Sequence, residues 1–183
     1  MRFWIDTEYD DSGDRAVLIS LGAVAEDGRE FYAVSLEFDP KKTKPWVQEN
    51  VLPYLPTKGS SAWKPLKAIA REFTDFVGEE PSEFWSLIAT YDWYLVTHEL
   101  LGGIDYLPHN WPFECWDLHE WAWRLGASEV YPQLQPSLQG GSPGHEALRG
   151  ARGQADLRLP GPVRARQRGV GLTQRMHSTS WVV

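Results

Sequence analysis

Three β-rich apolar runs occupy the first forty residues, and they constrain the fold more than any other feature of the chain. Residues 2–6 read as a short central strand, and residues 16–26 and 29–38 read as two further strands. Asp27 and Gly28 join the last two runs, and an Asp-Gly pair in such a place is a strong hairpin signal. The chain therefore opens with three strands, of which the last two are antiparallel.

Helical and extended patterns alternate after residue 40. Residues 44–51 have helical spacing, and so do residues 66–77, whose apolar side chains line one face. Residues 83–90 form a fourth apolar strand, and residues 91–101 read as the helix that follows it. Strands first, and then alternating helix and strand, predict an α/β domain with a mixed sheet.

The pattern becomes ambiguous after residue 112. Residues 113–118 read as a fifth strand followed by a helix over residues 119–126, and the whole stretch reads equally well as one helix. Residues 132–143 are a loop rich in Pro, Gly, Ser and Gln, and residues 145–152 start a last helix.

Composition narrows the class of protein. The 183 residues suit a single domain with a sizeable core. No stretch approaches the ~20 apolar residues of a membrane span, and the N-terminus lacks the pattern of a signal peptide. Cys115 is the only cysteine, so no internal disulfide is possible, which fits a reducing compartment. We therefore expect a cytoplasmic protein without membrane association.

Charge is unevenly distributed along the chain. The net charge of −7 argues against a bulk nucleic-acid coat protein, and it leaves room for an enzyme that grips a few nucleotides near metal ions. Residues 1–137 carry 11 basic and 23 acidic side chains, a net of −12, whereas residues 138–183 carry 7 Arg and two acids, a net of +5. The same tail contains no Lys and half of the 16 glycines.

Three acidic side chains stand where strands are predicted to end. Asp6 and Glu8 close the first apolar run and are one residue apart, so on an extended backbone they project to the same side. Two such carboxylates repel each other unless a cation lies between them, and Mg²⁺ favours oxygen ligands of this kind. Asp92 follows the fourth strand, at the sheet edge where ligand sites of α/β proteins gather. The alternatives are that Asp6 and Glu8 open a solvated loop, and that Asp92 is a helix N-cap.

Other arrangements of chemical groups are weaker. Two His-Glu pairs, at residues 98–99 and 119–120, begin like a zinc-protease motif, but Gly102 and Trp123 occupy the positions of the second His, which excludes that site. Asp6 and Glu8 could in principle be the acid pair of a glycosidase, but such acids normally flank the substrate from separate strands. The Trp-rich segment 111–123 is better explained as core and interface than as a surface for stacking bases.

The chain resembles the DEDDh superfamily of 3′-5′ exonucleases, and most closely a group of small bacterial 3′-exoribonucleases described as polyadenylate-specific. The resemblance covers roughly residues 1–152. The segments that carry it are Asp6-Thr7-Glu8, the long run Leu18–Pro40, Trp46-Val47, Val51-Leu52-Pro53, Ala89-Thr90-Tyr91-Asp92 and His145-Glu146-Ala147-Leu148.

The resemblance implies a ribonuclease-H-like fold, with a mixed sheet of about five strands and helices on both faces. It also implies phosphodiester hydrolysis with two Mg²⁺ or Mn²⁺ ions, of which Asp6 would bridge both and Glu8 would hold one. Asp92 matches the third acid, which acts through water at the metal, and His145 matches the general base. Thr7 would contact the terminal nucleotide. Two metal ions and a His of near-neutral pKa suit this chemistry.

One position departs from the family pattern. The family places a fourth acid five residues after the His, and this chain has Gly150 there. Beyond Arg152 the expected amphipathic helix fails, because Pro160, Pro162 and several glycines would break it. We therefore divide the chain into an exonuclease-like domain, residues 1–152, and an atypical tail, residues 153–183. Such a tail is expected either to be disordered or to reflect a GC-rich gene read out of frame.

The sequence thus favours a metal-dependent 3′-5′ exoribonuclease that trims single-stranded RNA 3′ ends, with activity impaired by Gly150. A catalytically inactive nucleic-acid-binding relative is the main alternative, and an unrelated hydrolase with an Asp/Glu pair is a third. DEDDh relatives are often homodimers, so the resemblance also implies a homodimer.

Overall fold

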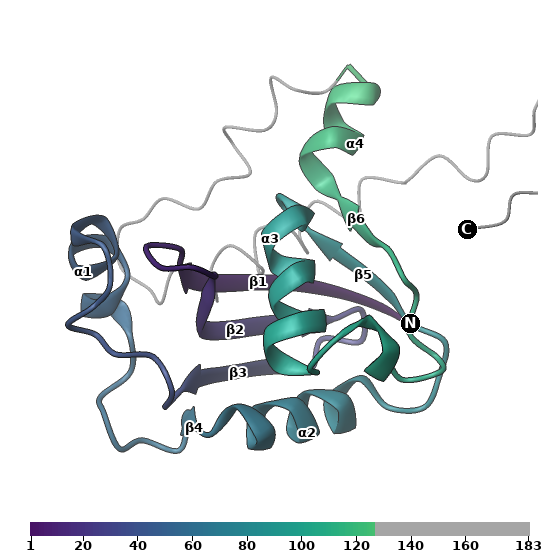
Figure 1. The fold of residues 1–183 in the computed structure, drawn as a ribbon. Helices are drawn as coiled ribbons and strands as arrows, with labels where there is room; N and C mark the ends of the chain where they lie inside the picture. The colour runs from purple at the N-terminus through teal and green to yellow at the C-terminus, as the bar shows by residue number, and fades with distance from the viewer. Residues whose placement is uncertain (127–183) are drawn as a thin grey trace, which may run out of the picture.

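A mixed β-sheet runs through the part of the chain that the computed structural model describes, residues 1–126 (Figure 1). Its strands are β1 (Arg2–Asp10), β2 (Val17–Ala25), β3 (Glu30–Ser35), β4 (Trp63–Lys64), β5 (Glu83–Ser86) and β6 (Cys115–Asp117). Their order across the sheet is β4-β3-β2-β1-β5-β6. Strand β2 is antiparallel to both of its neighbours, β1 and β3, whereas β4 pairs in parallel with β3, β5 with β1 and β6 with β5.

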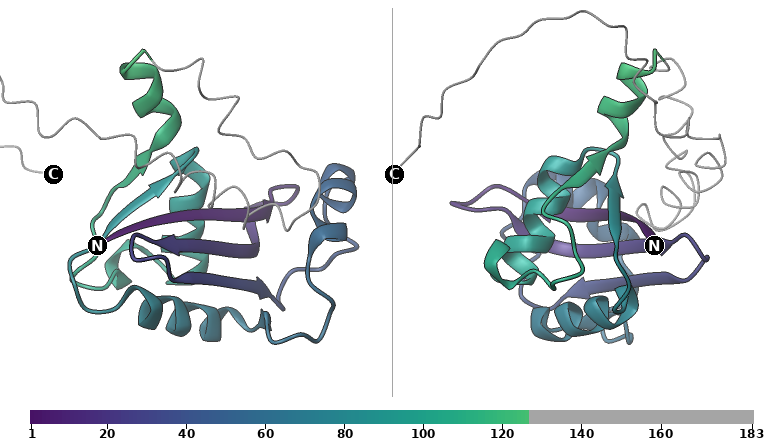
Figure 2. Two further views of the ribbon diagram at one scale, coloured as in Figure 1. Left: turned by 180° about the vertical axis from the view of Figure 1, so that it is seen from behind. Right: turned by 90° about the vertical axis from the view of Figure 1, so that its right-hand side faces the viewer.

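Helices follow and interrupt the strands. They are α1 (Pro45–Asn50), the 3₁₀ helix η1 (Leu52–Tyr54), α2 (Leu66–Val77), α3 (Ala89–Tyr94), the π-helix η2 (Leu95–Leu100), the 3₁₀ helix η3 (Ile104–Tyr106) and α4 (Leu118–Arg124). Two views from other sides show α4 projecting from the sheet beyond β6 (Figure 2). None of the helices described is long and apolar enough to cross a membrane.

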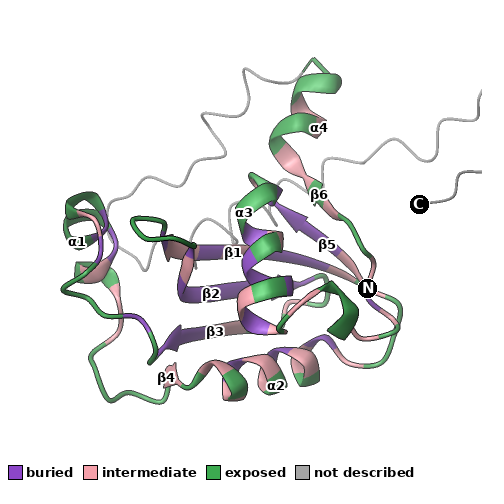
Figure 3. Ribbon diagram, in the orientation of Figure 1, coloured by how far each residue is buried: buried purple, intermediate pink, exposed green. Residues whose placement is uncertain are grey.

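The core lies on both faces of the sheet, and the central strands are buried along most of their length (Figure 3). One face carries the main cluster, in which Phe3 and Ile5 of β1 pack against Phe73 of α2 and Leu95 of η2. The other face carries two smaller clusters, one with α1 and one with the start of α4. The expected α/β sheet with helices on both faces is thus confirmed.

The number of strands differs from the expected five. Six strands are present among the described residues, and the additional one is β4. It has only two residues, Trp63 and Lys64, so it shows no alternation that a sequence pattern would detect.

A β-bulge lies beside the acidic end of β1. Glu8 pairs with Ser20 and Tyr9 pairs with Leu18, so that Ile19 is an extra residue in β2. The bulge changes the alternation of β2. Leu21 and Leu18 therefore face the same main cluster, although they are three residues apart.

The helix predicted over residues 66–77 is confirmed as α2. Ile69, Phe73 and Val77 form its buried face, as the apolar spacing requires. Glu37 accepts a hydrogen bond from the Leu66 N–H at the first turn, which satisfies one of the free N–H groups there. Gly78 ends the helix at φ +78°, a conformation that other residues rarely adopt.

The boundary between the fourth predicted strand and its helix was wrong. The strand was predicted over residues 83–90, but β5 ends at Ser86 and α3 begins at Ala89. The Asp117 carboxylate, at the end of β6, accepts a hydrogen bond from the Ala89 N–H at 2.9 Å, and this tertiary contact holds the first residue of α3. The remainder of the predicted helix over residues 91–101 is divided between α3 and η2.

The first of the two interpretations for residues 113–126 is correct. Strand β6 is followed directly by α4, and Asp117 is the N-cap, accepting a hydrogen bond from the Glu120 N–H at 2.8 Å. The predicted loop over residues 132–143, the helix over residues 145–152 and the tail over residues 153–183 lie outside the described residues.

Candidate active site

The acid pair lies in the second half of β1. Asp6 pairs with Gly22 and Glu8 with Ser20, so both side chains point away from the face that holds Phe3 and the main core cluster. Each acid is partly buried. The predicted same-side projection of the two carboxylates follows from this regular part of the strand, because the bulge begins only after Glu8.

The third acid joins this strand through hydrogen bonds. One Asp92 carboxylate oxygen, Oδ1, accepts from the Thr7 N–H at 2.9 Å and from the Thr7 hydroxyl at 2.5 Å. The other oxygen, Oδ2, accepts from the Ser86 hydroxyl. Asp92 is only 7% exposed, so these bonds hold a buried carboxylate in one orientation.

Strand order explains why Asp92 meets Thr7. Parallel pairing of β1 with β5 runs from Arg2 to Trp4, because β5 ends shortly after Trp85. The Thr7 N–H lies beyond that pairing and needs another acceptor. Asp92, in the first turn of α3, supplies that acceptor across 85 residues of sequence. The early end of β5 is therefore what places the third acid beside the first two.

The three carboxylates lie close enough for their charges to repel one another. Desolvation raises the pKa of Asp6 well above its usual value, and the charges of Asp92 and Glu8 raise it further. Desolvation and the Asp92 charge raise the pKa of Glu8 to about 7. Burial also raises the pKa of Asp92, against the lowering effect of its bonds from Ser86 and Thr7. Three carboxylates that resist ionisation together form a site that a cation would stabilise.

Two of the three acids offer oxygen atoms that suit a hard divalent cation. Asp6 and Glu8 offer carboxylate oxygens on one side of β1, the ligand chemistry that Mg²⁺ and Mn²⁺ prefer. Both oxygens of Asp92 already accept protein hydrogen bonds, which suits an indirect role. Within residues 1–126, no group of three or more His, Cys, Asp or Glu side chains is arranged to hold a metal ion.

The predicted site residues thus fall into two sets. Asp6, Thr7, Glu8 and Asp92 come together, whereas His145 lies outside the described residues, as does Gly150. Thr7 is 6% exposed and its hydroxyl is bonded to Asp92, so in this structure it positions the third acid. Its predicted contact with a nucleotide stays a prediction.

Sequence reasoning missed two supporting residues. Ser86 is a polar residue inside an otherwise apolar run, and that irregularity was the available signal for a buried hydrogen-bonding role. Asp117 joins the starts of α3 and α4 through its two carboxylate oxygens, and nothing local to the sequence around residue 117 indicates the bond to Ala89.

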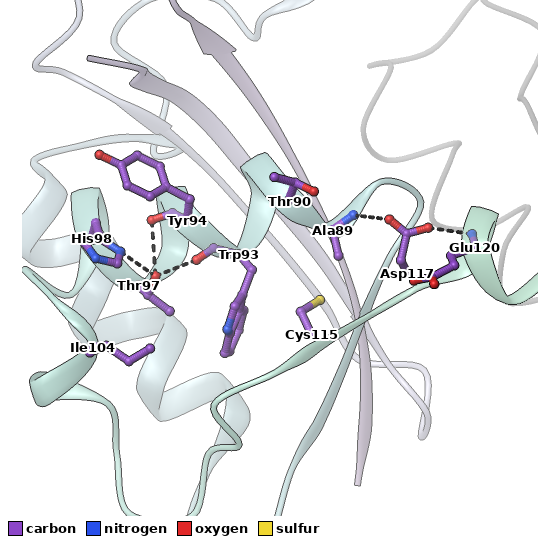
Figure 4. Close-up of a pocket in the computed structure, with 10 residues that line it drawn as sticks. All are labelled: Ala89, Thr90, Trp93, Tyr94, Thr97, His98, Ile104, Cys115, Asp117 and Glu120. Atoms are coloured by element: carbon purple, nitrogen blue, oxygen red, sulfur yellow. Dashed lines mark hydrogen bonds between the residues drawn. The ribbon is translucent and has the colours of Figure 1, made fainter. Parts of the chain in front are cut away.

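A cavity of about 410 Å³ lies between α3, η2 and β6, and none of the three acids lines it. Figure 4 shows Trp93, Tyr94 and His98 on the helical side and Cys115 on the strand side. The Tyr94 and His98 rings are stacked with centroids 4.8 Å apart, and the Thr97 hydroxyl lies 2.9 Å from His98 Nδ1. Burial raises the pKa of the Cys115 thiol, which disfavours a reactive thiolate.

The Trp-rich segment 111–123 is mixed in character. Trp111 is buried in the main core and Trp121 packs against the Trp4 and Trp85 cluster, as expected for packing residues. Trp116 and Trp123 are exposed instead.

Comparison with known proteins identifies two similar sequences. Both are 3′-5′ exoribonucleases of Mycobacterium tuberculosis, one from strain CDC 1551 / Oshkosh and one from strain ATCC 25618 / H37Rv. Each is 40% identical to this chain over 115 residues, which covers 61% of this chain and 68% of the relative. No protein-family profile matches the chain.

Proposed function

The chain belongs to the family of 3′-5′ exoribonucleases, and from this premise we propose that it hydrolyses phosphodiester bonds at the 3′ end of single-stranded RNA with the help of divalent metal ions. More narrowly, we propose a member of the DEDDh type, close to the polyadenylate-specific group. The proposal assigns Asp6, Glu8, Asp92 and His145 to catalysis.

One observation carries the proposal. Asp6 and Glu8 of β1 lie beside Asp92 of α3, and burial together with the charge of Asp92 raises the pKa of each of the first two. Such a cluster is unfavourable for folding alone, because each charge disfavours its neighbours. Shifted carboxylates gathered at one place are typical of sites that bind a cation or move protons.

The metal ions would be Mg²⁺ or Mn²⁺, and Asp6 and Glu8 are the residues that would hold them. When bound, two such ions supply electrostatic stabilisation of the attacking and the leaving oxygen in phosphoryl transfer. Hydrogen bonds from Thr7 and Ser86 hold the Asp92 carboxylate in one orientation. His145 is proposed to accept the proton of the attacking water, since an imidazole titrates near neutral pH.

An RNA degradation assay tests the proposal. A single-stranded RNA labelled at its 5′ end is incubated with the protein and Mg²⁺ or Mn²⁺, and the products are separated by length. We expect a ladder that shortens from the 3′ end, and protection of the same RNA when its 3′ end is blocked. Cleavage of circular RNA at an equal rate would contradict the exonuclease assignment.

Asp6→Asn provides the matched variant. It keeps the size of the side chain and removes one charge, so the fold is expected to persist while RNA turnover is abolished. Asp105→Asn is the control, because Asp105 is an exposed acid of η3 outside the cluster. A fully active Asp6→Asn protein would show that the acid pair is not the catalytic centre.

A relative that binds RNA without cleaving it is the second candidate. Gly150 favours it, because glycine offers no ligand at the position where the family pattern has a fourth acid. RNA binding without turnover in the assay above would identify this alternative.

A further inference from the structure

The cavity between α3, η2 and β6 joins aromatic and acidic side chains (Figure 4). Asp117 and Glu120 lie at one end, Tyr94 and His98 lie at the other, and Trp93 lies between the two ends. Among the described residues, none of those that line the cavity is a Lys or an Arg. Its volume of about 410 Å³ is in the range of pockets that take small ligands. Acids beside aromatic faces favour a cation as the occupant.

The groups that would meet a cation are fixed in place. The Trp93 Nε1–H donates to the Phe113 carbonyl at 2.7 Å, and the same ring packs against the main core cluster. The Asp117 carboxylate accepts from the N–H groups of Ala89 and Glu120. One aromatic wall and one carboxylate are therefore preorganised, which lowers the cost of binding.

The segment that forms the cavity is acidic and exposes apolar surface. Residues 89–126 carry six acids and one basic residue, Arg124, a net of −5, and Arg124 is paired with Glu120. Four large apolar side chains of this segment are at least 40% exposed: Tyr94, Ile104, Tyr106 and Phe113. Exposed apolar surface of this kind marks an interaction site, and the excess of acids disfavours RNA as its partner.

The end of the chain has the opposite charge. Residues 153–183 carry five Arg, no Lys and one acid, Asp156, a net of +4. Three of the five are Arg164, Arg166 and Arg168, the densest group of positive charge in the sequence after residue 126. Arg164 is 38 residues beyond Gly126, the last described residue. An extended chain of that length spans roughly 120 Å, so this group can reach the cavity.

We propose that the cavity binds an arginine side chain of the group 164–168 of the same chain. A guanidinium stacks on an indole or phenol face and pairs with a carboxylate through its planar fork. Its apolar stem would cover Ile104, whose surface is 40% exposed. The tether raises the effective concentration of the arginine, so that individually weak contacts suffice. This inference does not rest on the proposed function.

Photocrosslinking in the full chain tests the proposal. A photoreactive benzoylphenylalanine replaces Gln167, between Arg166 and Arg168. After irradiation, mass spectrometry separates monomers from crosslinked dimers and maps the crosslinked residues.

Two variants address the two sides of the contact, each with a matched control. The tail variant replaces the three arginines of the group 164–168 by Gln, and Arg175→Gln is its control. The cavity variant combines Tyr94→Ala with Glu120→Gln. Its control combines Tyr54→Ala with Glu49→Gln, because these residues are exposed in η1 and α1, away from the cavity.

We expect crosslinks within one chain to residues 89–126. Loss of the cation or of its aromatic partner should lower their yield about fivefold in both variants, the size of one cation–π contact. Both controls should crosslink like the original chain. Lys in place of the three arginines should restore the yield only in part, since an ammonium keeps the charge and lacks the planar fork. In 1 M NaCl, where charges are screened within about 3 Å, the yield should also fall.

Three outcomes would overturn the proposal. They are crosslinks that lie outside residues 89–126, a yield that the tail variant leaves unchanged, and full recovery with Lys, which would indicate attraction by charge alone. Crosslinked dimers in place of monomers would likewise refute it and would make a second copy of the chain the occupant. RNA turnover is measured separately, so failure of this contact and failure of the nuclease proposal are distinguishable.

Discussion

Asp92 is the residue of the candidate site whose side chain makes the most hydrogen bonds to its neighbours. It accepts three hydrogen bonds, two from Thr7 and one from Ser86, and these bonds oppose the rise in its pKa that burial causes. A buried carboxylate that loses a donor must either stay ionised at higher cost or take up a proton. Small changes to its neighbours are therefore expected to act on both stability and activity.

Ser86→Ala tests this dependence. Removing a hydrogen bond to a carboxylate is expected to lower the free energy of unfolding by about 2 kcal/mol. It should also lower kcat/KM on RNA roughly tenfold, which corresponds to ~1.4 kcal/mol of transition-state stabilisation. Urea unfolding and RNA turnover are the measurements. Ser12→Ala is the control, because it removes a similar bond to Asp10 away from the acid cluster. Unchanged kcat/KM in Ser86→Ala would contradict the role given to Asp92.

The raised pKa values of Glu8 and Asp6 predict how stability depends on pH in the absence of metal. The pKa of a glutamate in the unfolded chain is near its usual value of 4.5, whereas burial and the Asp92 charge raise the pKa of Glu8 in the folded protein to about 7. Between these values the folded state binds more protons, so stability is highest below about pH 4.5 on this account and falls as pH rises through 7. The melting temperature, measured in EDTA, should drop by ~2–4 °C for each 1 kcal/mol lost.

Divalent ions should reverse this fall. Because metal ligands must be deprotonated, Mg²⁺ or Mn²⁺ is expected to raise the melting temperature more at pH 8 than at pH 5. Glu8→Gln should flatten the pH dependence, since the group that titrates near 7 is gone. If the melting temperature of the original protein in EDTA does not change with pH, the raised pKa values of Asp6 and Glu8 are refuted.

At the scale of elements, the structure shows how α3 and α4 are held at the sheet edge. Asp117, at the end of β6, caps α4 through Glu120 and bonds the first N–H of α3 at Ala89. One side chain therefore holds the start of α3, the helix that carries Asp92. The local sequence around Asp92 indicates only a helix start.

Asp117→Ala is expected to lower the free energy of unfolding by about 2 kcal/mol, since an N-cap and a second hydrogen bond contribute about 1 kcal/mol each. Asp117→Ser should recover about half of the loss, because a serine can cap α4 and is too short to hold both helices. Asp75→Ala, an exposed acid on α2, is the control. Chemical denaturation provides the measurement, and equal stability of the Ala and Ser variants would show that the joining bond contributes nothing.

At the scale of the whole molecule, the described residues supply a six-stranded mixed sheet and three of the proposed catalytic acids, while the remaining proposed catalytic residue, His145, lies beyond residue 126. The composition changes sharply in that part of the chain, which becomes basic, glycine-rich and free of lysine. An independent reading of the gene across codons 135–183 would decide between a genuine tail and a change of frame.

Gly150→Asp tests whether the missing acid limits the enzyme. A metal ligand contributes several kcal/mol to the transition state, so its absence should slow turnover on the order of a thousandfold. Restoring an acid is expected to recover a large part of that rate, measured as kcat on short RNA. Gly150→Ala is the control, because in the helix predicted over residues 145–152 it would remove the penalty of glycine, about 1 kcal/mol, without adding a ligand. No gain in Gly150→Asp, with metal binding at Asp6 intact, would refute the assignment of position 150.

The sequence by itself determined the features that depend on local geometry. Apolar spacing of 3.6 residues identified α2, and the Asp-Gly pair identified the hairpin between β2 and β3. Alternation along a strand likewise put Asp6 and Glu8 on one side. In each case the deciding interaction lies within a few residues, so a periodic pattern is enough to predict it.

Only the tertiary structure decided how distant segments meet. The bond between Asp92 and Thr7 spans 85 residues, and it forms because β5 leaves the sheet before β1 ends. The stacking of Tyr91 on Tyr9 follows from the same geometry. Period and propensity describe one segment at a time, whereas these contacts depend on strand order and on where a strand ends, which packing of the whole sheet sets.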